Sequence, residues 1–429
     1  MSSPLRPRRA LSHRVREVIQ KLRRWKWLLI RIAPESLIRL YHSWSVRLEF
    51  DPRRYPRETL PAGLNIIGYL RSASGIGESA RSFVKAAEEG GVPAALYNAS
   101  GGYRERSEDD SLGSITQENP FDINLFCVNS QEMTTLRESL GGRFFANRVN
   151  VGYWYWEFPE LPASHRNRFE GLDEIWVASE FVRSAVKRAL PLERAMGVHV
   201  LPPLVEPRRS PASRGQLGLE AEEFVFLALA DAGSVLSRKN PEGAIEAFVR
   251  AFGVSKDVRL IVKVNHPGMD PAGVTALKRS AGRASIRVLD RVSSRDEIDA
   301  LLFHCDALVS LHRSEGLGLP CAEAMALGKP VIATDYSGST DFVSRETGFP
   351  VPCKLVQLPQ AIGPYEAGAF WAEPDLDAAA SAMKQVVEDR RESRRRGAAG
   401  ASFIEGRYGR AAVAEMLRSR LDWLRSRRQ

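Results

Sequence analysis

A chain of 429 residues exceeds the length at which one hydrophobic core stops growing, so we expect two domains of about 150 to 200 residues each. Its composition, 44% hydrophobic and 26% charged, is typical of a soluble globular protein, and no apolar run approaches the roughly 20 residues that span a bilayer, which argues against an integral membrane protein. The formal net charge of +9 is concentrated near the N terminus, because residues 1–57 hold 15 Lys and Arg against 4 Asp and Glu.

Residues 1–57 form a basic leader with the pattern of an amphipathic helix. Apolar residues recur every three or four positions with arginines and lysines between them; they are Val15, Val18, Ile19, Leu22, Trp25 and Leu29. Such a helix either lies on an anionic membrane surface or docks on its own protein. The run WLLIRIA is short and interrupted by Arg31, which argues against a secretory signal. We therefore expect a cytoplasmic protein. If the leader helix lies on a membrane, the protein is peripheral on the inner face of that membrane.

Residues 58–205 alternate short apolar runs with helical patterns, as in an α/β domain with a parallel sheet. The apolar runs are LNIIGYL, FDINLFCV, RVNVGYWYW, DEIWVAS and VHVLPPLV, and helical patterns such as GESARSFVKAAEEGG and EFVRSAVKRAL lie between them. Continuous β-branched runs suit strands that are buried on both faces. The sequence therefore predicts a Rossmann-like N-terminal domain.

Within this domain Gly75, Gly77 and Ala80 spell G-x-G-x-x-A before a helix. Dinucleotide dehydrogenases combine this pattern with an acidic residue about 20 positions later that holds a ribose. The corresponding region here, AALYNASGG, contains neither Asp nor Glu. The two glycines indicate either a loop that approaches a ligand closely or a tight strand-to-helix turn.

A polar stretch at residues 206–222, EPRRSPASRGQLGLEAE, has the Pro, Arg, Ser and Gly content of a linker. The alternating pattern then restarts, from FVFLALA to KPVIATD, and predicts a second Rossmann-like domain over residues 223–405. A helix over residues 406–429 follows, which could pack back on the N-terminal domain. Ligands of open α/β sheets bind at the carboxyl ends of the strands, so we expect a site in a cleft between the two domains.

Near the start of the second domain, Asn240 and Pro241 have the pattern of an N-cap and the first residue of a helix. This places Arg238 and Lys239 beside a positively polarised helix end, where an anion would bind. The alternative is an ordinary exposed basic pair before a helix.

Residues 312–334, HRSEGLGLPCAEAMALGKPVIAT, set Glu315 and Glu323 on either side of a glycine-rich turn and the start of a helix. Pro320 suits the first helical position and would place Glu323 in the first turn, while free N–H groups of the turn would bind phosphate. The carboxylates could then accept hydrogen bonds from hydroxyl groups on either side of a diphosphate, as in a nucleotide sugar. The alternative is that Glu323 only complements the helix dipole and Glu315 is a solvated loop carboxylate.

The stretch SEGLGLPCAEAMALGKPVIATDYSG, in which Glu315 and Glu323 form an E-x7-E motif, resembles the donor-site signature of the retaining family 4 glycosyltransferases (glycosyl transferases group 1) of the GT-B fold. Three other stretches resemble the same family: GYLRSASGIGESARSFVKAAEEGGVP, GYWYWEFPELP with DEIWVASEFVRSAV, and SRKNPEGAIEAFVRAF. The resemblance covers about residues 63–390 and implies two Rossmann-like parallel-sheet domains that face a cleft.

The resemblance also implies roles for individual residues. Glu315 would contact the donor sugar, Glu323 the ribose, and Lys239 would neutralise the diphosphate, which makes Glu315 and Lys239 the catalytic candidates. The implied donor-binding set is Gly75, Gly77, Arg238, Lys239, His312, Glu315, Gly316, Leu317, Gly318, Leu319 and Glu323. We expect no cofactor and no catalytic metal, because a lysine, a helix terminus and loop amides can stabilise a leaving diphosphate. Asp375 and Asp377 spell D-x-D, but they precede a helix and are interpreted as its N-terminal acids.

Two positions depart from the family pattern. Many relatives carry an arginine shortly before the lysine, where this chain has Gly233, and Arg238 or Arg313 are the candidates to replace it. Trp156 stands where many relatives have the histidine of a His-Glu pair, and Glu157 keeps the glutamate. We expect Glu157 in the cleft near the acceptor, and Trp156 either in contact with a sugar or in the core.

The predicted function is transfer of a sugar from a nucleoside diphosphate sugar to a hydroxyl group of a carbohydrate, lipid-linked or other acceptor, with retention of configuration, in the synthesis of a surface polysaccharide. One alternative is a nicotinamide-dependent oxidoreductase that uses the glycine loop. The other is a non-catalytic protein that binds a membrane or nucleic acid through the basic leader. Nucleic acid is not the expected partner, because the positive charge is confined to one terminal segment and no reader motif occurs.

Overall fold

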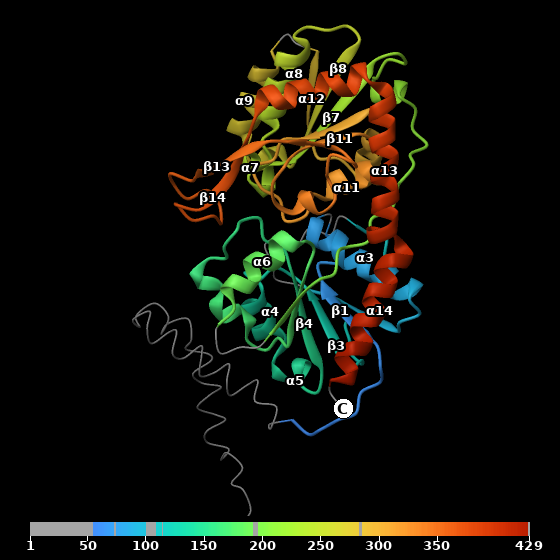
Figure 1. Cartoon of the computed structure of the whole chain (residues 1–429). Coiled ribbons are helices and arrows are strands. Elements are labelled where there is room, and N and C mark those ends of the chain that lie inside the picture. Colours follow the sequence, from blue (N-terminus) through green and yellow to red (C-terminus); the bar gives the residue numbers. More distant parts are fainter. Residues whose placement is uncertain are drawn as a thin grey trace, which may run out of the picture. The chain divides into compact units, whose positions relative to one another are not determined.

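The computed structural model describes residues 55–427 apart from residues 73, 100–108, 114, 192–195 and 283–284. Nearly all of the predicted basic leader lies outside the described residues. In the described part, two six-stranded parallel sheets follow each other along the chain, with helices between the strands (Figure 1). The predicted α/β class with two Rossmann-like domains is confirmed.

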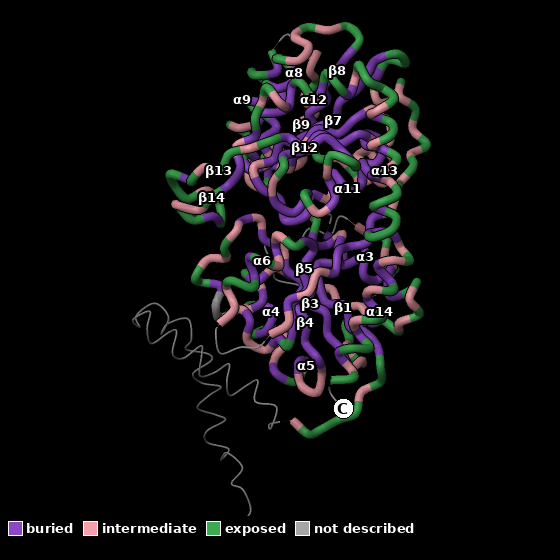
Figure 2. The backbone as a smooth tube through the Cα atoms, viewed as in Figure 1, coloured by how far each residue is buried: buried purple, intermediate pink, exposed green. Residues whose placement is uncertain are grey.

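The first sheet has the strand order β2-β1-β3-β4-β5-β6, and every neighbouring pair is parallel. Its strands are β1 (Leu64–Gly68), β2 (Ala94–Asn98), β3 (Ile123–Cys127), β4 (Val149–Trp154), β5 (Glu174–Val177) and β6 (Gly197–Val200). Its helices are α3 (Gly75–Glu89), α4 (Met133–Leu140), α5 (Gly142–Phe145), the 3-10 helix η2 (Ala163–Phe169) and α6 (Glu180–Ala189). Every residue of β1, β3 and β4 is buried (Figure 2), as the continuous apolar runs predicted.

The second sheet has the strand order β12-β11-β10-β7-β8-β9 and is also parallel throughout. Its strands are β7 (Phe224–Asp231), β8 (Val258–Asn265), β9 (Ile286–Asp290), β10 (Ala307–Ser310), β11 (Val331–Thr334) and β12 (Phe349–Val351). Its helices are α7 (Leu236–Lys239), α8 (Pro241–Phe252), α9 (Pro271–Ala281), α10 (Arg295–His304) and α11 (Leu319–Ala326), with short 3-10 turns η4 (Ala232–Ser234), η5 (Pro267–Met269) and η6 (Ser337–Asp341). The stretch expected to be a linker contains the 3-10 turn η3 (Gly215–Leu217).

An antiparallel hairpin, which the sequence did not predict, follows the second sheet. It consists of β13 (Cys353–Gln357) and β14 (Phe370–Pro374). Helix α12 (Leu376–Glu388) begins directly after it, and the carboxylate of Asp375 accepts hydrogen bonds from the amides of Asp377 and Ala378, each over 3.0 Å. The interpretation of the D-x-D pair as helix N-terminal acids is confirmed.

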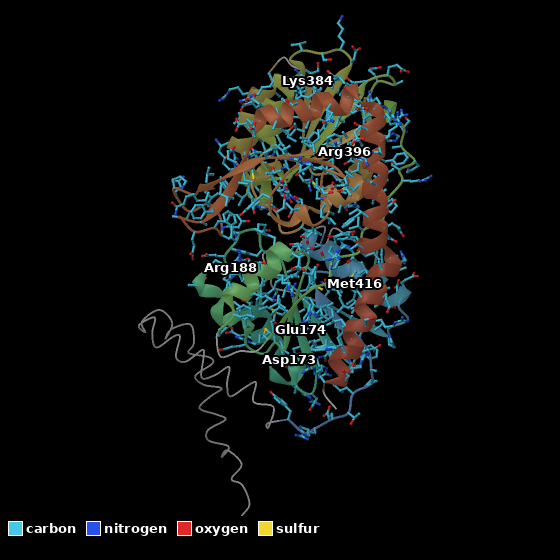
Figure 3. The ribbon with its side chains drawn as sticks, in the orientation of Figure 1. Asp173, Glu174, Arg188, Lys384, Arg396 and Met416 are labelled. Carbon is cyan, nitrogen blue, oxygen red and sulfur yellow. The ribbon has the colours of Figure 1, made fainter. Side chains whose placement is uncertain are left out.

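The last two helices connect the domains. Helix α13 (Arg390–Tyr408) packs on α11 of the second domain, and α14 (Arg410–Ser426) packs along α3 of the first (Figure 1). Glu174 at the start of β5, labelled in Figure 3, accepts a hydrogen bond from Nε of Arg420 over 2.7 Å. Nε of Arg425 lies 2.9 Å from Oδ2 of Asp122. These ion pairs hold α14 against the first sheet.

Candidate active site

A cavity of about 310 Å³ lies at the carboxyl ends of strands from both sheets. Asn129 and Tyr155 line it after β3 and β4, and Asp231 and Asn265 line it at the ends of β7 and β8. The predicted site residues that line this cavity are Gly75, Glu157, Arg238, Lys239, Glu315, Gly316, Leu317, Gly318, Leu319 and Glu323. Their convergence from both domains on one cavity is typical of a ligand site in an open α/β fold.

Glu315 is at the centre of a buried charge cluster. Its Oε1 pairs with Nζ of Lys239, and its Oε2 lies 3.3 Å from Nη1 of Arg238. Burial raises the pKa of Glu315, but the charges of Lys239 and Arg238 together outweigh burial, and the pKa falls to about 2. The side chain is ionised at neutral pH and only 8% of the residue is exposed, so the alternative of a solvated loop carboxylate is wrong.

Arg238 lies buried between two carboxylates. Its Nη1 donates to the carbonyl of Ser314 over 2.7 Å, and its Nη2 lies 4.0 Å from Oε1 of Glu157. Burial lowers the pKa of Arg238, but the acidic groups around it, including Glu315, raise the pKa further, so that the net direction is upward. The alternative of an exposed basic pair is therefore wrong for Arg238, which is 3% exposed.

The turn that carries Lys239 is set by its neighbours. Lys239 ends the short helix α7, and Asn240, with a φ of 51°, caps α8 by accepting a hydrogen bond from the amide of Gly243 over 3.1 Å. Asparagine adopts this left-handed conformation more readily than most residues. Its Nδ2 donates to the carbonyl of Leu311 over 2.8 Å, which ties the turn to the segment just before Glu315. The predicted N-cap at Asn240 and the proline at the first helical position are confirmed.

The turn between β10 and α11 presents backbone groups to the cavity. Gly318 has a φ of 86°, which favours glycine, and its carbonyl accepts the amide of Cys321 over 2.9 Å. The amides of Leu317, Gly318 and Leu319 donate to no residue that the structure describes. These residues line the cavity at a helix N terminus, where such groups bind anions.

Helix α11 begins one residue earlier than predicted. Its first residue is Leu319, so Pro320 is the second helical residue and no acidic residue lies in the first turn. The prediction that Glu323 lies in the first turn is wrong. Glu323 is buried instead, and Nη2 of Arg295 lies 2.6 Å from its Oε1. Burial raises the pKa of Glu323, and Arg295 offsets part of that effect. Because Glu323 lies beyond the first turn and pairs with Arg295, it does more than complement a helix dipole.

Arg295 belongs to a second charge cluster that the sequence did not reveal. Its Nη2 also lies 2.7 Å from Oδ1 of Asp299, and Arg208 pairs with both Asp299 and Glu78 of α3. Burial raises the pKa of Glu78, but Arg208 and Arg295 lower it further, to about 2. The spacing of Arg295 and Asp299, one turn apart on a helix, was the sequence signal that could have indicated part of this cluster. In the described residues no group of three or more His, Cys, Asp or Glu is placed to share a metal ion.

Gly77 and Trp156, both predicted for the site, do not line the cavity. A Cβ atom on Gly77 would lie 2.4 Å from the carbonyl oxygen of Ser72, so the glycine is required by the tight turn before α3 rather than by a ligand. Trp156 is 4% exposed, and its indole N–H donates to the carbonyl of Glu160 over 2.7 Å. Of the two interpretations of Trp156, the structure favours the core.

His312 and Arg313 also lie outside the cavity. His312 is fully buried with Nε2 2.9 Å from Oγ of Ser339, and burial lowers its pKa to about 4, so the ring is neutral at neutral pH. Nε of Arg313 lies 2.7 Å from Oε2 of Glu373 on the hairpin. Of the two candidates to replace the arginine absent at Gly233, only Arg238 lines the cavity.

Lys263, which is not among the predicted site residues, also lines the cavity. It lies near the carboxyl end of β8, is 1% exposed, and its Nζ donates to the carbonyl of Val264 over 2.9 Å and to that of Arg291. Burial lowers the pKa of Lys263 to about 8. A lysine inside the apolar run VRLIVKVN was the sequence signal that could have found it.

Comparison with known proteins shows what the second domain is similar to. Residues 211–358 match the family model of the glycosyl transferases group 1, which supports the resemblance at the level of that group for this part of the chain. The matched segment contains Arg238, Lys239, Glu315 and Glu323. Over 148 residues the chain is 27% identical to the D-inositol 3-phosphate glycosyltransferase of Segniliparus rotundus, a match that covers 33% of this chain and 32% of that protein. The matched segment thus spans about a third of the length of this relative.

Solved structures resemble most of the chain. Sucrose-phosphate synthase from Thermosynechococcus elongatus has a TM-score of 0.60 at 14% identity, covering 85% of this chain and 99% of that one. The Anabaena protein HepE in complex with UDP and glucose has a TM-score of 0.58 at 15% identity, covering 84% and 99%. A glycosyltransferase from Rickettsia africae has a TM-score of 0.59 at 14% identity, covering 85% and 98%. At these identities the likeness establishes the fold, and the predicted GT-B architecture is confirmed.

Proposed function

We propose that the chain is a glycosyltransferase that moves a sugar from a nucleoside diphosphate sugar to an acceptor hydroxyl group. The observation that carries this proposal is the arrangement of Lys239, Glu315 and Glu323 around one cavity, together with the amides of residues 317–319. The match of residues 211–358 to the glycosyl transferases group 1 includes all of these residues and supports the proposal.

The proposed orientation of the nucleoside diphosphate sugar follows from the positions of these groups. Its diphosphate lies against the amides of residues 317–319 and the ammonium of Lys239, where a helix N terminus and a cation both stabilise negative charge. The sugar hydroxyls donate to Glu315 and the ribose hydroxyls to Glu323, since carboxylates are strong hydrogen-bond acceptors. The two acids are thus proposed to hold the two ends of the donor.

The main catalytic task is to stabilise the charge that develops on the diphosphate as its bond to the anomeric carbon breaks. Lys239, Arg238 and the turn amides supply this stabilisation, so the proposed reaction needs no metal ion and no cofactor. The sugar becomes oxocarbenium-like, and Glu315 stabilises its positive charge. The acceptor oxygen bonds to the anomeric carbon on the face that the phosphate leaves, the departing phosphate takes the bonding electron pair and the acceptor proton, and the configuration is retained.

The proposed setting is the cytoplasmic side of a membrane, in the synthesis of a surface polysaccharide. The basic leader, residues 1–57, supports this setting by its charge and its amphipathic pattern, which suit an anionic lipid surface. No described helix is both long enough and apolar enough to cross a membrane. Co-sedimentation with anionic vesicles tests the setting, because full-length protein should pellet with them and a variant that begins at residue 58 should not.

A thermal-shift screen tests the function itself. Wild-type protein is heated with UDP-, GDP- and ADP-sugars, and with NADH as the comparator for the oxidoreductase alternative. A donor at about 100 times its dissociation constant should stabilise the native state by about 2.7 kcal/mol. Lys239→Met should reduce this shift, while Lys384→Met, an exposed lysine on α12 that is labelled in Figure 3, should not. Stabilisation by NADH alone would refute the proposal.

A further inference from the structure

A second hollow, of about 310 Å³, lies between two loops that belong to different domains. One loop, residues 156–162, follows β4 of the first domain, and the other joins β13 to β14 at the second (Figure 1). We call this hollow the hairpin groove. Its aromatic lining residues are Trp156, Phe158, Tyr365 and Phe370, and its acidic lining residues are Glu160 and Glu366.

The walls of the hairpin groove are held in place by ring contacts across the two loops. The rings of Phe158 and Tyr365 stack with their centroids 4.1 Å apart, and Trp156 meets Tyr365 edge to face at 5.6 Å. The bond from the indole of Trp156 to the carbonyl of Glu160 closes the first loop on itself. A groove with walls fixed in this way is ready to bind without reordering, which reduces the entropy cost of binding.

The hairpin groove adjoins the donor cavity through one residue. Glu157 lies in the sequence between Trp156 and Phe158, which line the groove, while Glu157 itself lines the donor cavity. The hydroxyl of Tyr365 donates to Oε2 of Glu157 over 3.0 Å. The wall of the groove at Tyr365 and the wall of the donor cavity at Glu157 are thus in direct contact, and the groove lies next to the donor cavity.

The chemistry of the lining indicates what kind of molecule this is. Phe370, Pro159 and Pro162 offer apolar surface to the C–H faces of sugar rings, and the exposed carboxylates of Glu160 and Glu366 can accept hydrogen bonds from hydroxyl groups. The described residues that line the groove include no Lys, Arg or His. Acidic side chains without a cation disfavour a phosphate-bearing ligand.

We propose that the hairpin groove binds the acceptor of the reaction, and that this acceptor is an uncharged oligosaccharide rather than a phosphate-linked lipid. This proposal rests on the proposed glycosyltransferase function and adds the substrate class and its site. The hairpin β13–β14 completes the groove and is thus a specificity element of the second domain.

Binding of defined glycans tests the proposal. The probes are maltotriose, cellotriose, mannotriose and chitotriose, with maltose 1-phosphate as the charged comparator, each titrated by saturation-transfer NMR in the presence of the stabilising nucleoside diphosphate. Ala367→Trp fills the groove from an exposed position on the hairpin loop, and Phe370→Ala removes a ring that is 46% exposed. Leu355→Ala is the matched control, because Leu355 is 57% exposed on the same hairpin and does not line the groove.

We expect a neutral trisaccharide to bind the wild type and Leu355→Ala equally, and to bind Ala367→Trp at least about tenfold more weakly. Three results would overturn the groove assignment. Maltose 1-phosphate could bind more tightly than the neutral glycans, Ala367→Trp could leave trisaccharide binding unchanged, or no trisaccharide could bind at all. The nucleotide thermal shift is measured on the same samples. If that shift persists in every variant while the glycan result is negative, the proposed function stands and the groove assignment alone is wrong.

Discussion

The ammonium of Lys239 pairs directly with the carboxylate of Glu315 inside the cavity, although the two residues lie 76 positions apart in the sequence. In the proposed donor complex they face different groups, the lysine the diphosphate and the glutamate the sugar. The ion pair therefore holds both side chains in the cavity before the donor arrives. Such preorganised charges are the usual source of the largest electrostatic effects in enzymes.

Lys239→Met should lower kcat by about 10²–10³, the loss seen when one preorganised group that stabilises a developing anion is removed. Steady-state kinetics with the donor found in the screen measures this effect. Because Lys239 and Glu315 touch, the double variant Lys239→Met/Glu315→Gln should lose less than the sum of the two single losses, by about 1 kcal/mol or more. Strict additivity would show that the pair does not act as a unit.

Glu315 should make the free energy of unfolding depend on pH in the acid range. Its pKa in the folded protein is about 2, below its ordinary value of 4.5, so its ionised form stabilises the fold above about pH 4.5, and this stability is lost as the pH falls through the range between the two values. The free energy of unfolding of Glu315→Gln should therefore approach that of the wild type as the pH falls below 4.5. Urea denaturation at several pH values measures the difference, and a constant difference down to the acid range would contradict the cause given for the low pKa.

Glu323 should contribute to the binding of the nucleoside and not to the binding of the phosphates. Glu323→Gln keeps the shape of the side chain but removes the charge, so the affinity for the nucleoside diphosphate should fall by about tenfold. The affinity for inorganic diphosphate, which has no ribose, should stay the same. Isothermal titration calorimetry of both ligands tests this, and an equal loss for the two would place Glu323 at the phosphates.

The attachment of the C-terminal helix should contribute measurably to stability. Arg420→Met removes the partner of Glu174, whose side chain is 4% exposed, and should lower the free energy of unfolding by about 3 kcal/mol, as when a buried ion pair loses one member. Arg418→Met is the control, since its partner Glu415 is 58% exposed and such pairs contribute about 0.5 kcal/mol. Equal losses in urea denaturation would mean that the Arg420 contact does not hold α14 to the first domain.

Local features of the site could be predicted from the sequence because the chain signals them within a few residues. Asn240 and Pro241 form the helix start that their residue types favour, and the predicted glycine-rich turn lies directly before α11. The buried strands followed from continuous apolar runs in the same way. The predicted start of α11, Pro320, was one residue too late, since Leu319 and Pro320 both suit a first turn.

Pairings between distant residues could not be predicted, because no local pattern encodes them. Arg295 approaches Glu323 only through the packing of α10 beside α11, and Tyr365 reaches Glu157 from 208 positions away. The β13–β14 hairpin gave no clear signal either, because β13 exposes most of its residues and lacks a buried run. These contacts depend on the assembled fold, and they decide which predicted residues face the cavity.

Titration of a nucleoside diphosphate sugar and of the matching nucleoside diphosphate into wild-type and Glu315→Gln protein tests whether Glu315 holds the donor sugar while Lys239 holds the diphosphate. We expect the substitution to lower the affinity for the nucleoside diphosphate sugar by about tenfold or more relative to the affinity for the nucleoside diphosphate. The affinity for the nucleoside diphosphate itself should stay unchanged or rise, because Lys239 is released from its partner. An unchanged ratio of the two affinities would show that Glu315 does not hold the donor sugar.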